Sequence, residues 1–83
     1  MAKPTPSRRI VASVARELKA ERVRRGISMT KLADESGLSQ QMISYVERGM
    51  RSPTLDTLLR ITAVLNIDLS KVIKAASEGK ARR

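Results

Sequence analysis

The chain has 83 residues, of which 41% are hydrophobic, and its formal net charge at pH 7 is +9. A chain of this length forms one domain, which buries about 60 to 65% of the surface that the unfolded chain exposes. Cysteine and histidine are both absent, which excludes disulfides, thiolate metal sites and the catalytic mechanisms that use these side chains. No apolar run approaches the roughly 18 residues that span a bilayer, and no signal-peptide pattern is present, so we expect a cytoplasmic protein with no membrane partner.

The first predicted helix covers residues 8–25. Residues 1–7 contain two prolines and no apolar periodicity, which indicates a flexible arm, and Ser7 stands where it can cap the helix that follows. Gly26 is expected to end that helix. One stripe of the helix is apolar and consists of Val11, Val14, Ala15 and Leu18.

Residues 28–49 have the pattern of two short helices joined by a tight turn, at 29–36 and 40–48. Ser28 and Ser39 are predicted to cap these helices by accepting backbone N–H bonds. Gly37 can adopt the left-handed conformation that ends the first of them. The two helices meet around the small residue Ala33 and the aliphatic residues Leu32, Leu38, Ile43 and Val46.

Two more helices complete the chain. Thr54 is predicted to cap a helix over residues 55–65, which Asn66 ends, and Asp68 to cap a short helix after it. The inner arc of the longer helix is expected to hold Leu55, Leu58, Leu59, Ile61, Thr62 and Leu65. The sequence therefore predicts an all-α, compact five-helix domain over residues 8–75, flanked by the basic arm 1–7 and a flexible basic tail, 76–83.

The positive charge is unevenly distributed. Residues 1–25 hold eight Lys/Arg and two Glu, residues 74–83 hold four Lys/Arg and one Glu, and residues 26–73 hold five of each sign. Such a balance suits a polyanionic partner that is attracted by the two ends of the chain. The alternative is that basic ends merely keep a small protein in solution.

The second helix of the pair has a polar outer arc. Helical projection places Gln41, Ser44 and Tyr45 on this arc, with Gln40 at its flank. A Gln amide can bond both N6 and N7 of adenine, and hydroxyl groups can bond bases or phosphates, so these four side chains are candidates for contacts with bases. The alternative is that any surface helix has a polar outer face.

Charged residues also face inward in the projections. Arg22 falls on the apolar stripe of the first helix and Glu47 on the inner arc of residues 40–48, so we expect them to form a partly buried, bidentate ion pair. The alternative is that each side chain extends separately to the solvent. Glu17 and Glu21, one turn apart among several Lys/Arg, are interpreted as a solvated face.

The chain resembles the phage-repressor and Cro type of helix-turn-helix protein, also called the XRE type, over roughly residues 10–74. The resemblance lies in the order of Arg22, Gly26, Ile27-Ser28, Leu32-Ala33, Gly37-Leu38-Ser39, Ile43, Glu47-Arg48-Gly49 and Pro53-Thr54-Leu55. It implies a lambda-repressor-like domain that binds double-stranded DNA as a dimer. It also implies base contacts by Gln40, Gln41, Ser44 and Tyr45, phosphate contacts near Ser28, Ser39, Arg48 and Arg51, and the Arg22–Glu47 ion pair.

One position departs from the family pattern. Many members have Gln after the cap of the first helix of the pair, where it touches a phosphate and braces the first Gln of the second helix; here that residue is Met29. Its side chain can do neither, so the bracing is left to Thr30 or to water. The backbone N–H groups at Met29 can still hold a phosphate.

Aliphatic residues near the C-terminus exceed the obvious needs of the core, which suggests a homodimer interface formed by Val64, Leu69, Val72 and Ile73. The alternative is a small domain that is simply apolar on several sides. The sequence thus predicts a non-enzymatic, sequence-specific transcription regulator, found on the nucleoid when bound to a two-fold symmetric operator, with no metal, cofactor or small-molecule ligand. The alternative function is a protein-interaction adaptor or antitoxin with the same fold, whose surface would be richer in large apolar anchors.

Overall fold

The computed structural model describes residues 6–79, which form five helices and no strand. The helices are α1 (Pro6–Arg24), α2 (Met29–Ser36), α3 (Gln40–Glu47), α4 (Leu55–Leu65) and α5 (Leu69–Ser77). This result confirms the prediction of an all-α, five-helix fold. Among the described residues, no helix has both the length and the apolar character required to cross a bilayer.

Both ends of the fold extend beyond the predicted domain of residues 8–75, because α1 takes in the last two residues of the predicted arm and α5 continues to Ser77, into the predicted tail. α1 begins at Pro6, because proline has no N–H to satisfy and its fixed φ suits the first helical position. Ser7 therefore lies inside the helix, and the prediction that it caps α1 was wrong. The rest of the predicted arm, residues 1–5, and the last four residues of the predicted tail, 80–83, lie outside the described residues.

Side-chain caps begin four of the helices. The hydroxyl of Ser28 accepts a bond from the backbone N–H of Lys31 at 3.0 Å, and Thr54 does the same for Thr57 at 3.1 Å. Asp68 caps α5 through the N–H of Ser70 at 2.9 Å. These predicted caps are confirmed, and each satisfies one N–H that the helix itself leaves without a partner.

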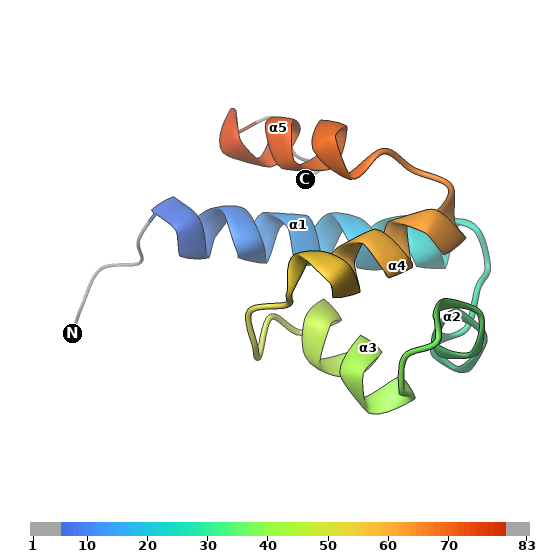
Figure 1. Ribbon diagram of the computed structural model, residues 1–83. Helices are drawn as coiled ribbons and strands as arrows, with labels where there is room; N and C mark the ends of the chain where they lie inside the picture. The colour runs from blue at the N-terminus through green and yellow to red at the C-terminus, as the bar shows by residue number, and fades with distance from the viewer. Residues whose placement is uncertain (1–5, 80–83) are drawn as a thin grey trace.

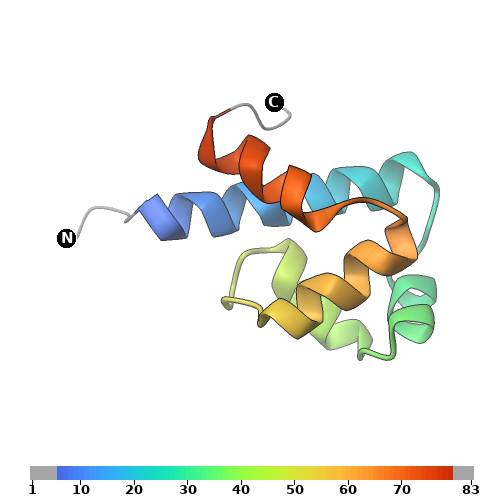
Figure 2. The same cartoon turned by 45° about the horizontal axis from the view of Figure 1, so that its top comes forward.

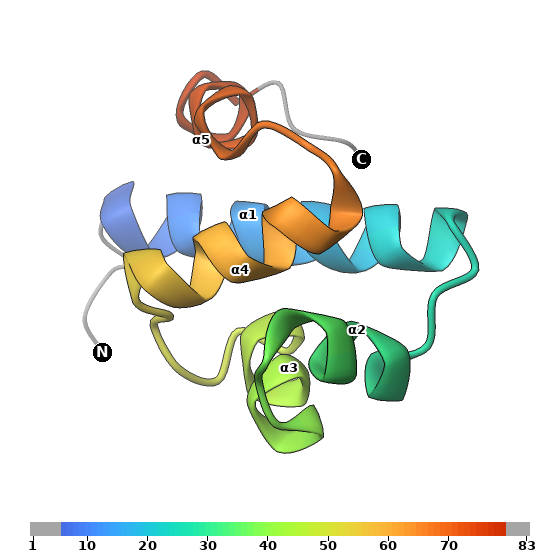
Figure 3. The ribbon, with the colours of Figure 1, turned by 45° about the vertical axis from the view of Figure 1, so that its right-hand side comes forward.

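The core lies where α1, α4 and the helix pair α2–α3 meet. α1 contacts α3, α4 and α5, and α2 contacts α3 and α4. α5 packs on the side of α1 that is opposite the helix pair (Figures 1 and 3). In Figure 2, α4 leads from the loop beside α3 up towards α1 and α5. The most deeply buried side chains are Leu18, Leu32, Ile43, Ile61, Leu65 and Val46.

α4 buries fewer leucines than its pattern indicated. Leu55 is 62% exposed and Leu59 is 50% exposed, so their assignment to the inner arc was wrong. Ile61, Thr62 and Leu65 are buried, with the hydroxyl of Thr62 donating to the carbonyl oxygen of Leu58 at 2.9 Å. α4 contacts α1, α2 and α5, and these contacts leave Leu55 and Leu59 exposed.

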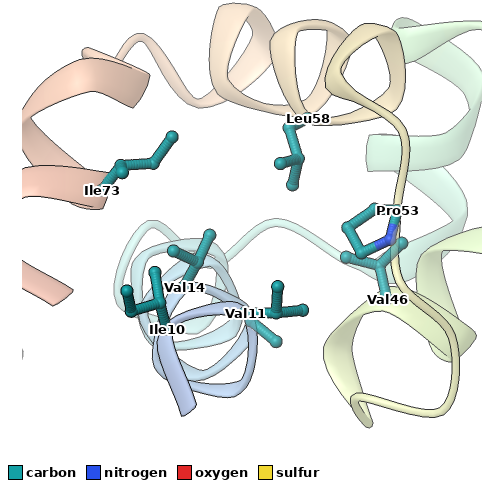
Figure 4. A pocket seen from close by; sticks show the side chains of 8 residues that line it. Ile10, Val11, Val14, Val46, Pro53, Leu58 and Ile73 are labelled. Carbon is teal, nitrogen blue, oxygen red and sulfur yellow. The ribbon is translucent and has the colours of Figure 1, made fainter. Parts of the chain in front are cut away.

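An apolar hollow lies at the junction of α1, α5 and the start of α4. Figure 4 shows its side chains pointing towards a common centre, with Ile73 of α5 across from α1. The residues that line it are Ile10, Val11, Val14, Ala15, Val46, Pro53, Leu58 and Ile73.

Candidate nucleic-acid interface

The start of α3 presents two adjacent glutamines to the solvent. Ser39 caps the helix by accepting a bond from the N–H of Met42 at 3.0 Å. Ile43 and Val46 are 0% and 2% exposed, which fixes the inner side of α3 against the core. Gln40 and Gln41 consequently lie on the exposed side. The other two predicted contact residues, Ser44 and Tyr45, are half-buried further along the helix.

Gln40 is held from α2. The hydroxyl of Thr30 donates to Oε1 of Gln40 at 3.2 Å, which is the bracing role that Met29 cannot perform. The Met29 side chain is partly buried and packs against the core. A threonine one residue later in the chain thus takes the place of the family's glutamine in orienting Gln40.

Gln41 is held from within α3. Its Nε2 donates to the hydroxyl oxygen of Tyr45 at 2.7 Å, and the guanidinium carbon of Arg51 lies 4.9 Å from the centre of the tyrosine ring. The first contact follows from the spacing of one helical turn, which the sequence displays. The contact of Arg51 with Tyr45 depends on the path of the loop after α3. No sequence pattern predicts that path, so this contact was not predicted.

A buried ion pair joins α3 to α1 and fixes their relative position. Nε and Nη2 of Arg22 donate to the two carboxylate oxygens of Glu47 at 2.6 and 3.0 Å, and the two side chains are 10% and 4% exposed. Nη1 of Arg22 also donates to the carbonyl oxygen of Ile27 at 2.7 Å. Both charges are therefore compensated, and the guanidinium connects α1, α3 and the loop before α2.

The interpretation of Glu21 as part of a solvated face was wrong. Glu21 is only 4% exposed and accepts bonds from both Arg25, at 2.8 Å, and Arg24. The side-chain hydrogen bonds from Arg25 and then Arg24 lower the pKa of Glu21, against the opposing effect of burial. The sequence carried the signal, since both arginines lie one turn after Glu21, but only the fold shows that the carboxylate is buried.

The predicted phosphate contacts surround the glutamines. Ser28 and Ser39 start α2 and α3, and their hydroxyl oxygens already accept capping bonds, which leaves each hydroxyl hydrogen available to a phosphate. Arg48 is exposed at the end of α3. Arg51 and Arg8 line one hollow between the start of α1 and the loop after α3, although Arg8 was not among the predicted site residues.

The four residues predicted to form a dimer interface differ in exposure. Leu69 is 6% exposed and buried within the chain itself. Val64 and Val72 are partly buried against the core. Ile73 is 36% exposed at the rim of the apolar hollow. Three of the four thus retain surface that a second copy can contact.

A family model described as helix-turn-helix matches residues 18–72 of the chain. The transcriptional regulator SutR of Escherichia coli is 41% identical over 56 residues, which are 68% of this chain and 32% of SutR. SlrR of Bacillus subtilis is 33% identical over 75% of this chain and 41% of its own. The chain thus spans less than half of the length of these two regulators.

A relative of similar length also matches. The uncharacterized helix-turn-helix regulator y4dJ of Sinorhizobium fredii is 31% identical over 71 residues, which are 86% of this chain and 88% of y4dJ. The family match covers the buried ion pair, both helices of the motif and all of α4. The chain therefore belongs to the phage-repressor and Cro (XRE) type of helix-turn-helix family.

Proposed function

We propose that this protein regulates transcription by binding double-stranded DNA, with α3 in the major groove. The observation that carries the proposal is the exposed start of α3, where two adjacent glutamine amides are each held by a neighbouring hydroxyl group. Side chains fixed in this way lose little conformational freedom on binding a base edge. The chemistry is that of a binding protein and not of an enzyme, in keeping with the family and with the names of its relatives.

The proposed contacts divide into two classes. Gln40, Gln41, Ser44 and Tyr45 contact bases. Phosphate oxygens are bound by the hydroxyls of Ser28 and Ser39, the backbone N–H of Met29, and the guanidinium groups of Arg48 and Arg51. We add Arg8 to the second class, because it lines the same hollow as Arg51. Contacts of the first class give sequence preference, and those of the second give affinity that depends on salt.

The protein acts as a homodimer on a two-fold symmetric operator in this proposal. The support is the aliphatic surface around Val64, Val72 and Ile73, underlain by the buried Leu69. In a helix-turn-helix dimer, the two reading helices lie about 34 Å apart and enter successive major grooves on one face of the duplex. We further expect the protein in the cytoplasm, associated with the nucleoid.

Selection of bound DNA from a random pool, repeated at several salt concentrations, tests this function. We expect a palindromic consensus from the wild-type protein. Gln41→Ala should relax the base preference at one position of each half-site. Arg48→Ala should instead weaken binding to all sequences equally and reduce by about one the slope of the logarithm of the binding constant against the logarithm of the salt concentration. Enrichment of no consensus, together with a steep salt dependence, would reduce the protein to a non-specific cationic binder.

The adaptor or antitoxin function is less well supported. The large apolar side chains exposed on the described surface are Val23, Met50, Leu55, Leu59 and Ile73. None of them belongs to the outer face of α3, where an adaptor that uses this helix would need its anchors.

A further inference from the structure

The loop after α3 folds back onto the face of α3 that we propose reads DNA. Gly49 reverses the chain at a φ of +66°, and the N–H of Met50 donates to the carbonyl oxygen of Tyr45 at 3.0 Å. This turn places Arg51 next to Tyr45, and the guanidinium carbon of Arg51 lies 4.9 Å from the centre of the tyrosine ring. A cation over the face of an aromatic ring at this distance is attracted to it.

Tyr45 in turn engages one defined atom of Gln41. The amide nitrogen of Gln41 uses one of its two hydrogens on the tyrosine hydroxyl oxygen, at 2.7 Å. One N–H and the carbonyl oxygen remain. This remaining pair matches the major-groove edge of adenine, whose N7 accepts and whose N6 donates. Guanine presents two acceptors, N7 and O6. The carbonyl oxygen of Gln41 would then face O6, and because both atoms are acceptors, no hydrogen bond could form between them.

We propose that Tyr45, held in place by Arg51, is a positioning residue that orients the Gln41 amide and so makes this position of the half-site prefer adenine over guanine. The inference rests on the proposed function, because it requires Gln41 to meet a base. It gives Tyr45 an effect through Gln41 in addition to its own proposed base contact, and it gives Arg51 a part in sequence preference in addition to its phosphate contact. It also explains why a half-buried aromatic ring lies on an otherwise amide-rich face.

Binding to synthetic operators tests the inference. The position read by Gln41 is first identified as the one whose preference is lost in Gln41→Ala. The ratio of the dissociation constants for guanine and adenine at that position is then measured for wild type, Tyr45→Phe and Arg51→Ala. We expect Tyr45→Phe to reduce this ratio about fivefold, the equivalent of one ordinary hydrogen bond. Arg51→Ala should reduce it less, because the hydroxyl group is still present.

The matched control removes the other hydroxyl. Thr30→Val deletes the group that donates to Gln40 and leaves the contact between Gln41 and Tyr45 intact. This variant should alter the preference at the neighbouring position and leave the adenine preference of Gln41 within twofold. Replacement of the adenine by 7-deazaadenine, which lacks the N7 acceptor, should weaken wild type more than Tyr45→Phe.

The outcomes separate the inference from the function on which it rests. If the wild-type protein has no sequence preference, the proposed function fails. If Gln41 reads adenine and Tyr45→Phe leaves the ratio unchanged, the function stands and the positioning role is overturned. A preference for guanine at this position, or an equal loss at every position in Tyr45→Phe, also overturns it. Thermal unfolding of each variant verifies the fold, and if Tyr45→Phe is unfolded, an unchanged ratio in Arg51→Ala overturns the inference.

Discussion

The buried ion pair between Arg22 and Glu47 links α3 to α1. Two hydrogen bonds join the side chains, and a third joins Arg22 to the carbonyl oxygen of Ile27. Removing one partner of such a pair leaves the other charge buried without compensation, which costs more than the pair contributes when both partners are present. The pair therefore fixes the position of α3 more than it raises stability.

We predict that Glu47→Ala lowers the free energy of unfolding by about 3 to 5 kcal/mol, as expected for an orphaned buried charge. Urea denaturation followed by circular dichroism measures it. Glu35→Ala is the control, because Glu35 and Lys31 form an exposed pair at 3.7 Å, and its cost should stay below about 0.5 kcal/mol. Similar losses in the two variants would show that the burial of Glu47 is of no consequence.

Acid should weaken the contribution of Glu21. Its folded-state pKa lies below the ordinary value of 4.5, so its stabilising effect is complete above that pH and is lost as the pH falls through the folded-state pKa. We predict that wild type is more stable than Glu21→Gln at pH 7 and that this difference shrinks below pH 4.5. The pKa of Asp68, lowered by its bond from the Ser70 hydroxyl, acts in the same direction but cancels between the two proteins. A difference that widens on acidification would contradict the prediction.

The starts of α2, α3, α4 and α5 were predictable because the determinants of a capped start are local, whereas the start of α1 was not predicted correctly. A cap such as Ser28 or Thr54 acts within three residues of its own position, and a stop such as Asn66 needs only its own backbone conformation. The exposure of Leu55 and Leu59 was not predictable, because a helical projection counts apolar residues without knowing which neighbours exist to cover them. The contact of Arg51 with Tyr45 was not predictable either, because it depends on the path of the loop that joins them, which a helical projection does not describe.

The turn between α2 and α3 provides a test at the level of elements. Gly37 ends α2 at a φ of +75°, and an added Cβ would approach only the end of the flexible Arg60 side chain, at 3.2 Å. We therefore predict that Gly37→Ala costs about 1 to 2 kcal/mol of stability, almost all of it from the left-handed backbone. Chemical denaturation measures this cost.

Asparagine is the matched replacement at this position. Asn66 already adopts a φ of +56° at the end of α4, so the protein tolerates asparagine in this conformation. Gly37→Asn should cost clearly less than Gly37→Ala. Equal costs for the two variants would locate the damage in side-chain crowding and not in the backbone.

The arrangement of the whole molecule constrains how two copies bind one duplex. α5 lies on the side of α1 opposite to α2 and α3 (Figures 1 and 3). If two copies met through the outermost face of α5, their α3 helices would point in opposite directions and could not share one face of the DNA. We therefore expect the interface of the proposed dimer on a flank of the molecule, where Val64, Val72 or Ile73 would contact the second copy beside the first.

We predict that Ile73→Glu raises the dimer dissociation constant about tenfold or more, because it places a charge in an apolar seam. Sedimentation velocity over a range of concentrations measures the effect. Leu59→Glu is the matched control: Leu59 is 50% exposed against 36% for Ile73, and it lies on a different face of α4 from Val64. Ile73 also lines the apolar hollow, so the thermal unfolding of both variants is compared to separate dissociation from loss of α5 packing. Dissociation by Leu59→Glu alone would move the seam to the exposed leucines of α4, and a wild-type monomer at micromolar concentration would refute a stable dimer altogether.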